Sequence, residues 1–238
     1  MLLFYLRHGD PMYEPDILTE LGKKQAQALA KRLALYGLDK IYSSTSPRAI
    51  ETAQPTCDLL KQEMHLLDFC NEGHAWRDFT ISNGKDRVWL YASDKAKLLF
   101  TDSELLKAPH LWYEHPAFQA EYDYKASVQR MYDKLDEFLL SHGYEHIRGT
   151  GRYKAVKPND ERIAIFAHEG MGMALLSCLL DIPYPIFATH FALCHSGMSV
   201  IEFKTKDGVS IPKLLTLSSD SHLYREGLPT NYNNEIRF

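Results

Sequence analysis

Short runs of apolar residues along the chain are followed by longer stretches in which apolar residues recur every three or four positions. The run at 2–6 is wholly apolar and stops at Arg7-His8-Gly9, as expected of a strand buried on both faces. Apolar residues then recur at helical spacing over about 20–36, after the favoured N-cap residue Thr19 and before Gly37. This part of the chain predicts a buried strand followed by an amphipathic helix.

The same pattern recurs in two further strand–helix pairs, which two late strands follow. These elements are predicted at 39–43, 47–62, 162–167, 169–180, 198–203 and 214–217. Strands that alternate with helices are typical of an α/β fold, because a parallel strand pair needs a crossover connection. We therefore expect a three-layer α/β/α fold with a mostly parallel central sheet.

The segment from about 73 to 160 interrupts this alternation. It contains all three tryptophans, a helical pattern over about 125–142, and a stretch at 141–159 that predicts a surface hairpin or loop. Insertions in such folds often form lids, because ligands bind beyond the carboxyl ends of the strands. We expect one domain over 1–238, with 73–160 as a helical and loop insertion that acts as a lid. We expect the tryptophans mainly in its small core.

Composition narrows the class of protein. The 238 residues are 45% hydrophobic and 24% charged, which is ordinary for a globular chain. A net charge of -4 disfavours nucleic acid or an anionic membrane as the main partner. No apolar run reaches the ~18 residues of a membrane span. The 4 cysteines form no C-x-x-C pair, and we expect reduced core thiols in a cytoplasmic protein.

Basic and imidazole side chains directly follow the first three predicted strands. Arg7 and His8 follow the first strand, Arg48 lies at the start of the helix after the second, and His168 follows the third. Because the carboxyl ends of parallel strands lie on one side of a sheet, we expect these side chains to meet in one crevice. Arginine side chains and helix N-termini both bind phosphate oxygens well. Gly9 would let the backbone approach such a ligand closely.

We interpret His8 as a nucleophile. An imidazole nitrogen attacks phosphorus only when it is neutral, and nearby cations disfavour a second positive charge. The leaving alcohol then needs a proton, which a carboxyl group in a partly enclosed site can supply. Glu72 is the first candidate for this acid, Asp68 is the alternative, and Glu169 is a third. His195 either lines the pocket or has a structural role.

These residues lie in motifs that resemble those of the histidine phosphatase superfamily, also called the phosphoglycerate mutase-like family. The similar segments are 6–9, 18–26, 41–44, 46–53 and 167–170. The resemblance implies a phosphohistidine intermediate at His8, a proton donor near Glu72, and neither a metal nor another cofactor. It also implies a set of phosphate-binding residues: Arg7, Gly9, Thr19, Arg48 and His168.

The superfamily contains phosphatases and mutases, and this chain departs from the mutase pattern. The mutases typically continue Arg-His-Gly with Glu-Ser, whereas this chain has Asp10-Pro11. They also carry a basic residue where Pro47 precedes Arg48 here, and their Arg-Arg pair has no match between 73 and 125. We therefore expect hydrolysis of phosphomonoesters by a metal-independent phosphatase. A cofactor-dependent phosphoglycerate mutase and a non-catalytic phospho-ligand binding protein are the alternatives.

The sequence predicts few partners for such a phosphatase. We expect a small phosphorylated molecule as substrate, no nucleic acid and no membrane, and we leave a homodimer open. At the proton donor the usual Leu-x-Glu spacing of the family is replaced by Leu67-Asp68-Phe69, so Glu72 and Asp68 both stay open.

Overall fold

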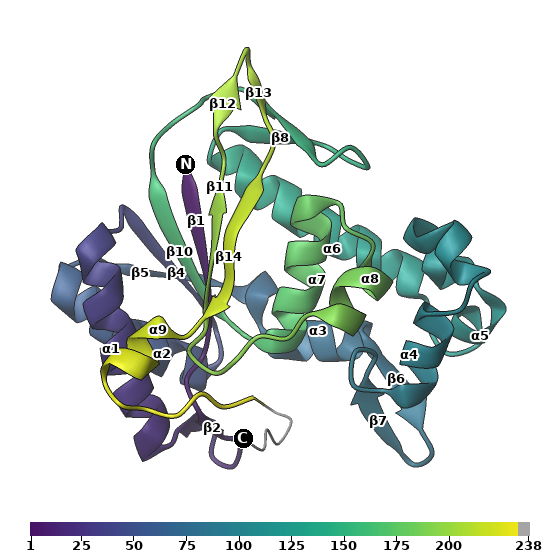
Figure 1. Ribbon diagram of the computed structural model, residues 1–238, viewed down its shortest axis with the longest axis horizontal. Helices are drawn as coiled ribbons and strands as arrows, with labels where there is room; N and C mark the ends of the chain where they lie inside the picture. Colours follow the sequence, from purple (N-terminus) through teal and green to yellow (C-terminus); the bar gives the residue numbers. More distant parts are fainter. Residues whose placement is uncertain (233–238) are drawn as a thin grey trace.

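The computed structural model describes residues 1–232, and its centre is a six-stranded sheet with the order β14-β11-β1-β10-β4-β5 (Figure 1). The strands are β1 (Leu2–Arg7), β4 (Lys40–Ser44), β5 (Met64–Leu67), β10 (Arg162–Ala167), β11 (Met198–Glu202) and β14 (Lys213–Ser219). β11 runs antiparallel to both of its neighbours, and the other pairs are parallel. The other strands of this sheet therefore share one direction, as a mostly parallel sheet requires.

Successive residues of the central strands are buried on opposite faces of the sheet. Leu3 and Tyr5 belong to one apolar cluster, and Phe4 and Leu6 belong to the other. Helices cover both clusters (Figure 1). On one face these are α1 (Glu20–Tyr36), α2 (Pro47–Leu60) and α9 (Ser221–Arg225), and on the other α3 (Glu72–Asp78), α6 (Tyr124–Ser141), α7 (Glu169–Leu180) and α8 (Tyr184–His190). The three-layer α/β/α prediction is confirmed.

Local sequence features determine where the core helices begin and end. The hydroxyl of Thr19 accepts a hydrogen bond from the backbone N–H of Gly22, which caps α1, and Gly37 at φ 68° ends that helix. α2 begins at Pro47, because a proline at the first helical position lacks only an N–H that has no partner there. The core helices and strands predicted from the sequence lie within 2 residues of the ends found in the structure.

The chain between β5 and β10 extends to one side of the sheet and then returns above it (Figure 1). Besides α3 and α6, its elements are η1 (Asp68–Cys70), β6 (Thr80–Asn83), β7 (Asp86–Trp89), α4 (Asp94–Phe100), η2 (Leu105–Lys107), η3 (Pro109–Glu114), α5 (Pro116–Gln119), β8 (Tyr144–Ile147) and β9 (Arg152–Ala155). β6, β7, α4 and α5 lie to the side, and the chain returns along α6 to β8 above the sheet (Figure 1). Trp112 is buried at its centre, with Phe100 and Phe118 around it. Trp76 is exposed and Trp89 is half-buried, so the expected tryptophan core is found for Trp112 only.

Besides β6 and β7, a four-stranded sheet and a short pair of strands lie outside the central sheet. The hairpin of β8 and β9 lies in the segment 141–159, for which the sequence predicts a surface hairpin or loop. The strands β12 (Thr205–Lys206) and β13 (Val209–Ser210), which the sequence did not predict, extend this hairpin into a sheet. A further short pair, β2 (Pro11–Met12) and β3 (Ile17–Leu18), lies in the loop that leads from β1 to α1. The end of the expected domain, 233–238, lies outside the described residues.

Two expectations from composition can be compared with the structure. No helix within residues 1–232 is long and apolar enough to cross a membrane. All four cysteines are buried and free of disulfide bonds, which agrees with the expected core thiols.

Candidate active site

The carboxyl ends of β1, β4 and β10 meet at the lower edge of the sheet in Figure 1. Arg7 ends β1 and His8 follows it, while His168 follows β10. The ring centroids of His8 and His168 lie 5.2 Å apart, and Nη2 of Arg48 lies 3.0 Å from Nδ1 of His168. The structure thus brings together the four side chains that the sequence predicted to converge.

The ring of His8 has a fixed orientation. Its Nδ1 lies 2.7 Å from the carbonyl oxygen of Gly9 and donates to it, so Nε2 carries the lone pair. The backbone of His8 is bonded on both sides, through its N–H to Ala167 and through its carbonyl to Ser196. Burial, followed by the nearby His168, Arg7 and Arg48, lowers the pKa of His8 well below its usual value. His8 is therefore a buried neutral imidazole with a free lone pair on Nε2.

Arg7 is buried together with a carboxylate. Its Nη1 lies 3.0 Å from Oε2 of Glu169, the first residue of α7, and donates to the carbonyl oxygen of Leu193. The other carboxylate oxygen of Glu169 accepts a hydrogen bond of 3.1 Å from the N–H of Leu193. Glu169 therefore compensates the buried charge of Arg7, which explains its place next to the pocket without a role as proton donor.

Arg48 lies in the first turn of α2 and contacts both an acid and a histidine. Its Nη1 donates to Oδ1 of Asp16 over 2.6 Å, and its Nη2 donates to Nδ1 of His168. Thr52, one turn further along α2, accepts from the N–H of Gly9 at 3.0 Å and donates to the carbonyl of Arg48. This hydroxyl connects the loop after β1 to the helix that carries the arginine.

His168 is buried, and three side chains are hydrogen-bonded to it. Nδ1 accepts from Arg48, so Nε2 carries the proton and donates to Oγ of Ser44 over 2.8 Å. Burial, and then Arg48 and Arg7, lower the pKa of His168 well below its usual value. The hydroxyl of Tyr5 donates to the His168 carbonyl over 2.7 Å, which fixes the backbone at the start of α7. His168 is therefore neutral at pH 7.

The two candidates for the proton donor lie on different sides of α3. Oε2 of Glu72 lies 3.2 Å from Nδ1 of His168, and it is a buried atom without a hydrogen bond among residues 1–232. Since His168 is neutral, this contact is not a full ion pair. Glu72 lines the pocket that also contains His8 and Arg48, which has a volume of about 390 Å³.

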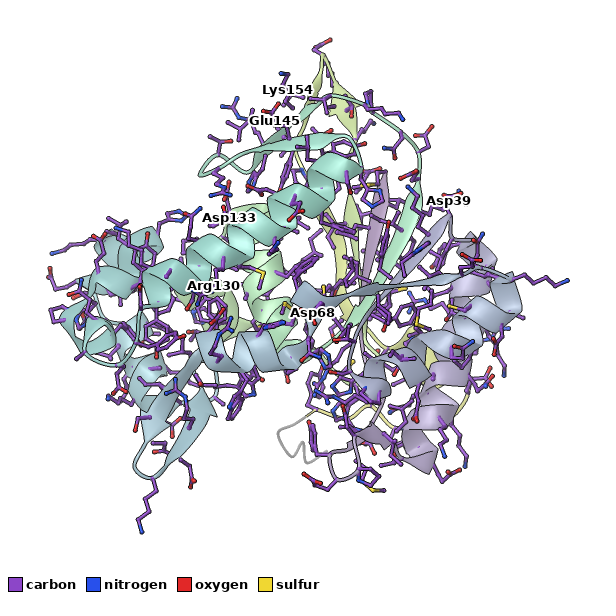
Figure 2. The ribbon with its side chains drawn as sticks, turned by 180° about the vertical axis from the view of Figure 1, so that it is seen from behind. Asp39, Asp68, Arg130, Asp133, Glu145 and Lys154 are labelled. Carbon is purple, nitrogen blue, oxygen red and sulfur yellow. The ribbon has the colours of Figure 1, made fainter. Side chains whose placement is uncertain are left out.

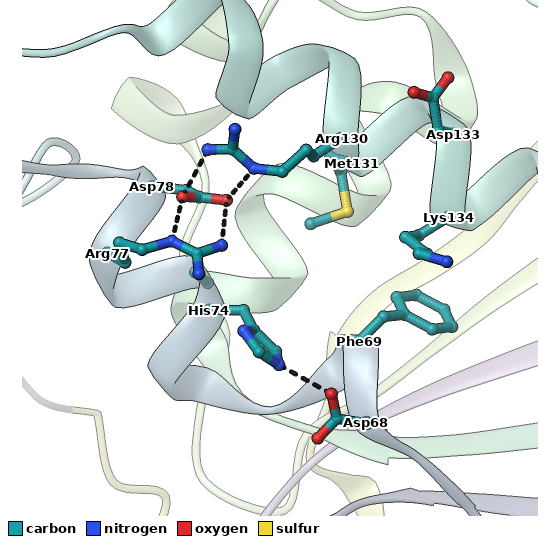
Figure 3. Close-up of a pocket in the computed structure, with 10 residues that line it drawn as sticks. Asp68, Phe69, His74, Arg77, Asp78, Arg130, Met131, Asp133 and Lys134 are labelled. Atoms are coloured by element: carbon teal, nitrogen blue, oxygen red, sulfur yellow. Dashed lines mark hydrogen bonds and ion pairs between the residues drawn. The ribbon is translucent and has the colours of Figure 1, made fainter.

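Asp68 lies in a second hollow, of about 480 Å³, between α3 and α6 (Figure 3). Its carboxylate is 2.9 Å from Nε2 of His74 and is largely exposed. Arg77 and Arg130 bind Asp78 in the same hollow. Seen from behind, Asp68 and Arg130 lie on this rear side of the molecule (Figure 2). The alternative donor therefore does not line the pocket of His8.

Gly9 and Thr19 have close partners within the protein. A Cβ on Gly9 would lie 2.7 Å from the carbonyl oxygen of Gly22, so α1 packs directly on this backbone. The hydroxyl of Thr19 donates to Oδ2 of Asp10 over 2.6 Å while it caps α1. These contacts give both residues a structural role, and their phosphate-binding roles stay predictions.

His195 lies beside His8 because β11 runs in the opposite direction to β1. Its ring centroid lies 5.7 Å from that of His8, and its Nδ1 lies 3.4 Å from Oδ1 of Asp10. Ser196, next to it, donates its N–H to the carbonyl of His8. The antiparallel strand therefore brings the segment before β11 to the carboxyl end of β1.

The structure adds residues that the sequence reasoning missed. Ser44 is the last residue of β4, so its place at a strand end was a usable indication that it would meet His168. Asp16 lies in the turn between β2 and β3, and nothing in its sequence surroundings points to Arg48. The remaining pocket residues come mostly from the insertion and are Gly73, Trp76, Trp89 and Tyr91, with Tyr13 and Gly170 from the core.

Comparison with known proteins gives a family match for the first part of the chain and fold matches for nearly all of it. Residues 3–89 match the family model of the histidine phosphatase superfamily (branch 1). This match covers the first three strands and the first two helices of the core, and it confirms the resemblance to that superfamily that was inferred from the sequence. No curated protein sequence matches the chain.

Several solved structures share the fold over nearly the whole chain. A phosphoserine phosphatase from Entamoeba histolytica, in complex with 3-phosphoglyceric acid, is 20% identical with a TM-score of 0.58, covering 93% of this chain and 98% of that one. A mycobacterial glucosyl-3-phosphoglycerate phosphatase is 15% identical with a TM-score of 0.57, covering 92% and 99%. The alpha-ribazole phosphatase from Shigella flexneri is 22% identical with a TM-score of 0.55, covering 92% and 97%. At these identities the likeness establishes a common fold.

Proposed function

We propose that this protein is a phosphatase that hydrolyses phosphomonoesters of small molecules through a phosphohistidine intermediate on His8. The observation that carries the proposal is the neutral His8, whose Nδ1 donates to Gly9. Its ring lines one pocket with Arg7 and Arg48, and it lies 5.2 Å from the ring of His168. Fold relatives that are phosphatases support it. We further propose that the chain forms one domain, with 73–160 as the insertion that covers the pocket.

In the first step, Nε2 of His8 attacks phosphorus and the bond from phosphorus to the ester oxygen breaks. Such a transition state spreads charge over three equatorial oxygens, and fixed donors stabilise it. Arg7 and Arg48 supply these donors, because guanidinium groups form paired hydrogen bonds to phosphate oxygens. The N-terminus of α7, directly after His168, adds free N–H groups and partial positive charge. This donor set requires no metal ion.

Glu72 is the proposed proton donor in this step. Nδ1 of His168 accepts from Arg48 and therefore presents no proton to Glu72 Oε2, which lies 3.2 Å away. A carboxyl group that carries its own proton is favourable at that position, whereas a carboxylate would face a lone pair. Glu72 gives this proton to the alkoxide oxygen as the alcohol leaves.

In the second step, water attacks the phosphohistidine. Glu72, now a carboxylate, accepts one proton of the water as the bond from phosphorus to Nε2 breaks. Inorganic phosphate leaves, and both His8 and Glu72 return to their starting protonation states. The cycle therefore consumes one water molecule and needs no other reactant.

The residues that line the pocket favour hydrolysis over transfer to a second phosphorylated substrate. Arg7 and Arg48 are the cations among the described lining residues, and the transferred phosphate needs both. A phosphoglycerate mutase must also bind the carboxylate of its substrate. The non-catalytic alternative is disfavoured by the presence of the nucleophile, the acid and both arginines in one pocket.

The experiment that tests the proposal is trapping of the intermediate. Purified protein is mixed with a radiolabelled phosphomonoester, quenched within milliseconds, and the labelled peptide is mapped. We expect an acid-labile, base-stable phosphoramidate on His8. His8→Ala should lose phosphate release by at least about a thousandfold. Phosphate release that continues unchanged in His8→Ala would contradict the proposal.

A further inference from the structure

Aromatic side chains of the insertion form one wall of the pocket that contains His8. Trp76 lies on α3, Trp89 ends β7, and Tyr91 follows it. The ring centroids of Trp76 and Trp89 are 4.9 Å apart with planes at 87°, and those of Trp89 and Tyr91 are 5.5 Å apart with planes at 20°. We call these three residues the aromatic wall. Trp76 is 40% exposed, so the wall leaves apolar surface uncovered beside the site.

The aromatic wall is held next to the proposed proton donor by a glycine. A Cβ on Gly170 would lie 2.5 Å from Cη2 of Trp89 and 2.6 Å from Oε1 of Glu72. The indole of Trp89 and the carboxyl of Glu72 therefore pack against the same backbone position, two residues after His168. A group that packs on Trp89 is consequently beside the acid that protonates a leaving oxygen.

The hairpin that carries Trp89 is fixed to the rest of the insertion. Trp89 pairs with Thr80 across β6 and β7, and Arg87 donates to both the hydroxyl and the carbonyl of Thr80. The hydroxyl of Tyr124 on α6 donates to the same carbonyl over 2.7 Å. The indole is therefore positioned before any ligand binds, which lowers the entropic cost of binding.

The charges in the pocket restrict what else a leaving group carries. Arg7 is paired with Glu169 and Arg48 with Asp16, and the proposed function assigns both arginines to the phosphate. Burial, and then Glu169, raise the pKa of Tyr91 well above its usual value, so its hydroxyl is uncharged. A second anionic group on the substrate would therefore lie against rings and the Glu72 carboxyl, because the described lining residues include no cation besides Arg7 and Arg48.

We propose that the substrate is a phosphomonoester whose leaving group carries an uncharged aromatic ring, which packs on Trp76 and Trp89. This inference rests on the proposed phosphatase function and names its substrate class. Aromatic rings pack favourably edge-to-face or offset, and Trp76 and Trp89 offer a face and an edge at right angles. The pocket volume of about 390 Å³ lies within the range of small-molecule sites.

The test compares benzyl phosphate with propyl phosphate, since both release a primary alcohol and differ in the ring. We expect kcat/KM for benzyl phosphate to be at least about tenfold higher, because burial of a ring contributes this much binding. 3-Phosphoglycerate, which carries a carboxylate, should be poorer than benzyl phosphate by at least about tenfold as well. Equal values for benzyl and propyl phosphate would overturn the inference.

Variants test whether the preference for benzyl over propyl phosphate depends on the aromatic wall. Trp89→Leu and Trp76→Leu should each lower the ratio of benzyl to propyl kcat/KM by about fivefold. The matched control is Tyr224→Leu, because Tyr224 is 88% exposed on α9 and does not line the pocket. Its ratio should equal that of the wild type. A ratio that survives both tryptophan changes would place the ring elsewhere and overturn the inference.

A binding measurement separates this inference from the proposed function. Calorimetry on the His8→Ala protein compares benzyl and propyl phosphate without turnover. If wild-type protein hydrolyses neither ester while His8→Ala binds benzyl phosphate about tenfold more tightly, the phosphatase proposal fails and the substrate class stands. If hydrolysis depends on His8 but neither turnover nor binding discriminates between the esters, the substrate class fails and the function stands. Failure of both turnover and binding overturns both.

Discussion

Nδ1 of His8 and the carbonyl oxygen of Gly9 lie 2.7 Å apart. A carbonyl only accepts hydrogen bonds, so this contact assigns the proton to Nδ1 and leaves Nε2 as the atom available for attack. The contact is between adjacent residues and thus depends on the backbone after β1. That backbone is itself fixed by Thr52 on α2 and by Gly22 on α1.

The electrostatic surroundings of His8 predict the pH dependence of activity. Burial, His168 and the two arginines lower the pKa of His8, so the nucleophile is protonated only at a pH well below 6.5. Because activity needs neutral His8, it should persist as the pH falls through 6.5 and be lost only at a pH well below 6.5. Arg48→Gln removes one cation and should raise the pKa of His8, which moves the acid limb of kcat/KM to higher pH.

The measurement is the full profile of kcat/KM against pH for wild-type and Arg48→Gln protein. The height of the profile should fall in the variant, because a phosphate ligand is lost. The position of the acid limb is the decisive quantity. An acid limb that stays in place or moves to lower pH in Arg48→Gln would contradict the role assigned to His8.

Esters with different leaving groups show whether Glu72 or Asp68 is the proton donor. Glu72→Gln should lower kcat/KM for an alkyl phosphate by about 10²–10⁴-fold, because kcat/KM reports the first step and an alkoxide leaves poorly without a proton. The loss should be much smaller for 4-nitrophenyl phosphate, whose phenolate leaves readily. Steady-state kinetics with the two esters measures this difference.

Asp68→Asn is the matched control for that experiment, since Asp68 is a largely exposed acid in the hollow behind α3. We expect both esters to be hydrolysed at nearly wild-type rates. The opposite pattern, with Asp68→Asn impaired and Glu72→Gln active on the alkyl ester, would reverse the assignment.

The buried pair of Arg7 and Glu169 predicts a large effect on stability. Glu169→Gln removes the carboxylate 3.0 Å from Arg7 and leaves the guanidinium charge buried. Removal of one partner of a buried ion pair costs about 3–5 kcal/mol of unfolding free energy. Urea denaturation followed by tryptophan fluorescence measures the change. Glu226→Gln, at a surface ion pair with Lys31, should leave the denaturation curve nearly unchanged.

A second buried cluster links stability to pH far from the site. Hydrogen bonds to Asp136 and Asp181 outweigh burial and raise the pKa of His146 above 6.5. Hydrogen bonds from His146, Gly151 and Tyr132 outweigh burial and lower the pKa of Asp181 from 3.8 to about 2. The histidine contributes stability in full below pH 6.5, and the aspartate does so above pH 3.8. Their joint contribution should be greatest between these values and fall as the pH rises past the raised pKa of His146.

Asp181→Asn tests this cluster. It should lower the unfolding free energy at pH 6 by about 3 kcal/mol and reduce the fall seen between pH 6 and pH 9. Denaturation curves at several pH values measure both effects. Asp133→Asn is the control, since its side chain is 55% exposed. An Asp181→Asn protein with an unchanged pH slope would show that another group titrates.

The elements that the sequence predicted are those whose neighbours along the chain decide their structure. The buried run of β1, the cap at Thr19 and the first-turn Pro47 are local features, and the structure has them in place. The convergence of Arg48 and His168 followed from the rule that parallel strands end on one side. The direction of β11 was not predictable, because an apolar strand has the same pattern whichever way it pairs.

The parts of the fold and the site that the sequence did not predict depend on contacts between residues distant in the chain. β5 is half exposed at the sheet edge, so its pattern is too mixed to indicate a strand. Asp16 forms an ion pair with Arg48, and Glu169 forms one with Arg7. The residues next to them in the sequence do not indicate either contact. The choice between Glu72 and Asp68 needed the helix α3 itself, because the two carboxyls lie on its opposite sides.

The place of β1 in the middle of the sheet has a consequence for biosynthesis. Its two hydrogen-bonded neighbours are β10 and β11, which begin at Arg162 and Met198. β1 is therefore made before both of its partners, and its hydrogen-bonding edges stay unpaired until β10 and β11 have been made. Pairing across such sequence separations is slow and exposes strand edges to aggregation. The strand that precedes His8 is thus the segment for which we expect nascent chains to depend most on chaperones.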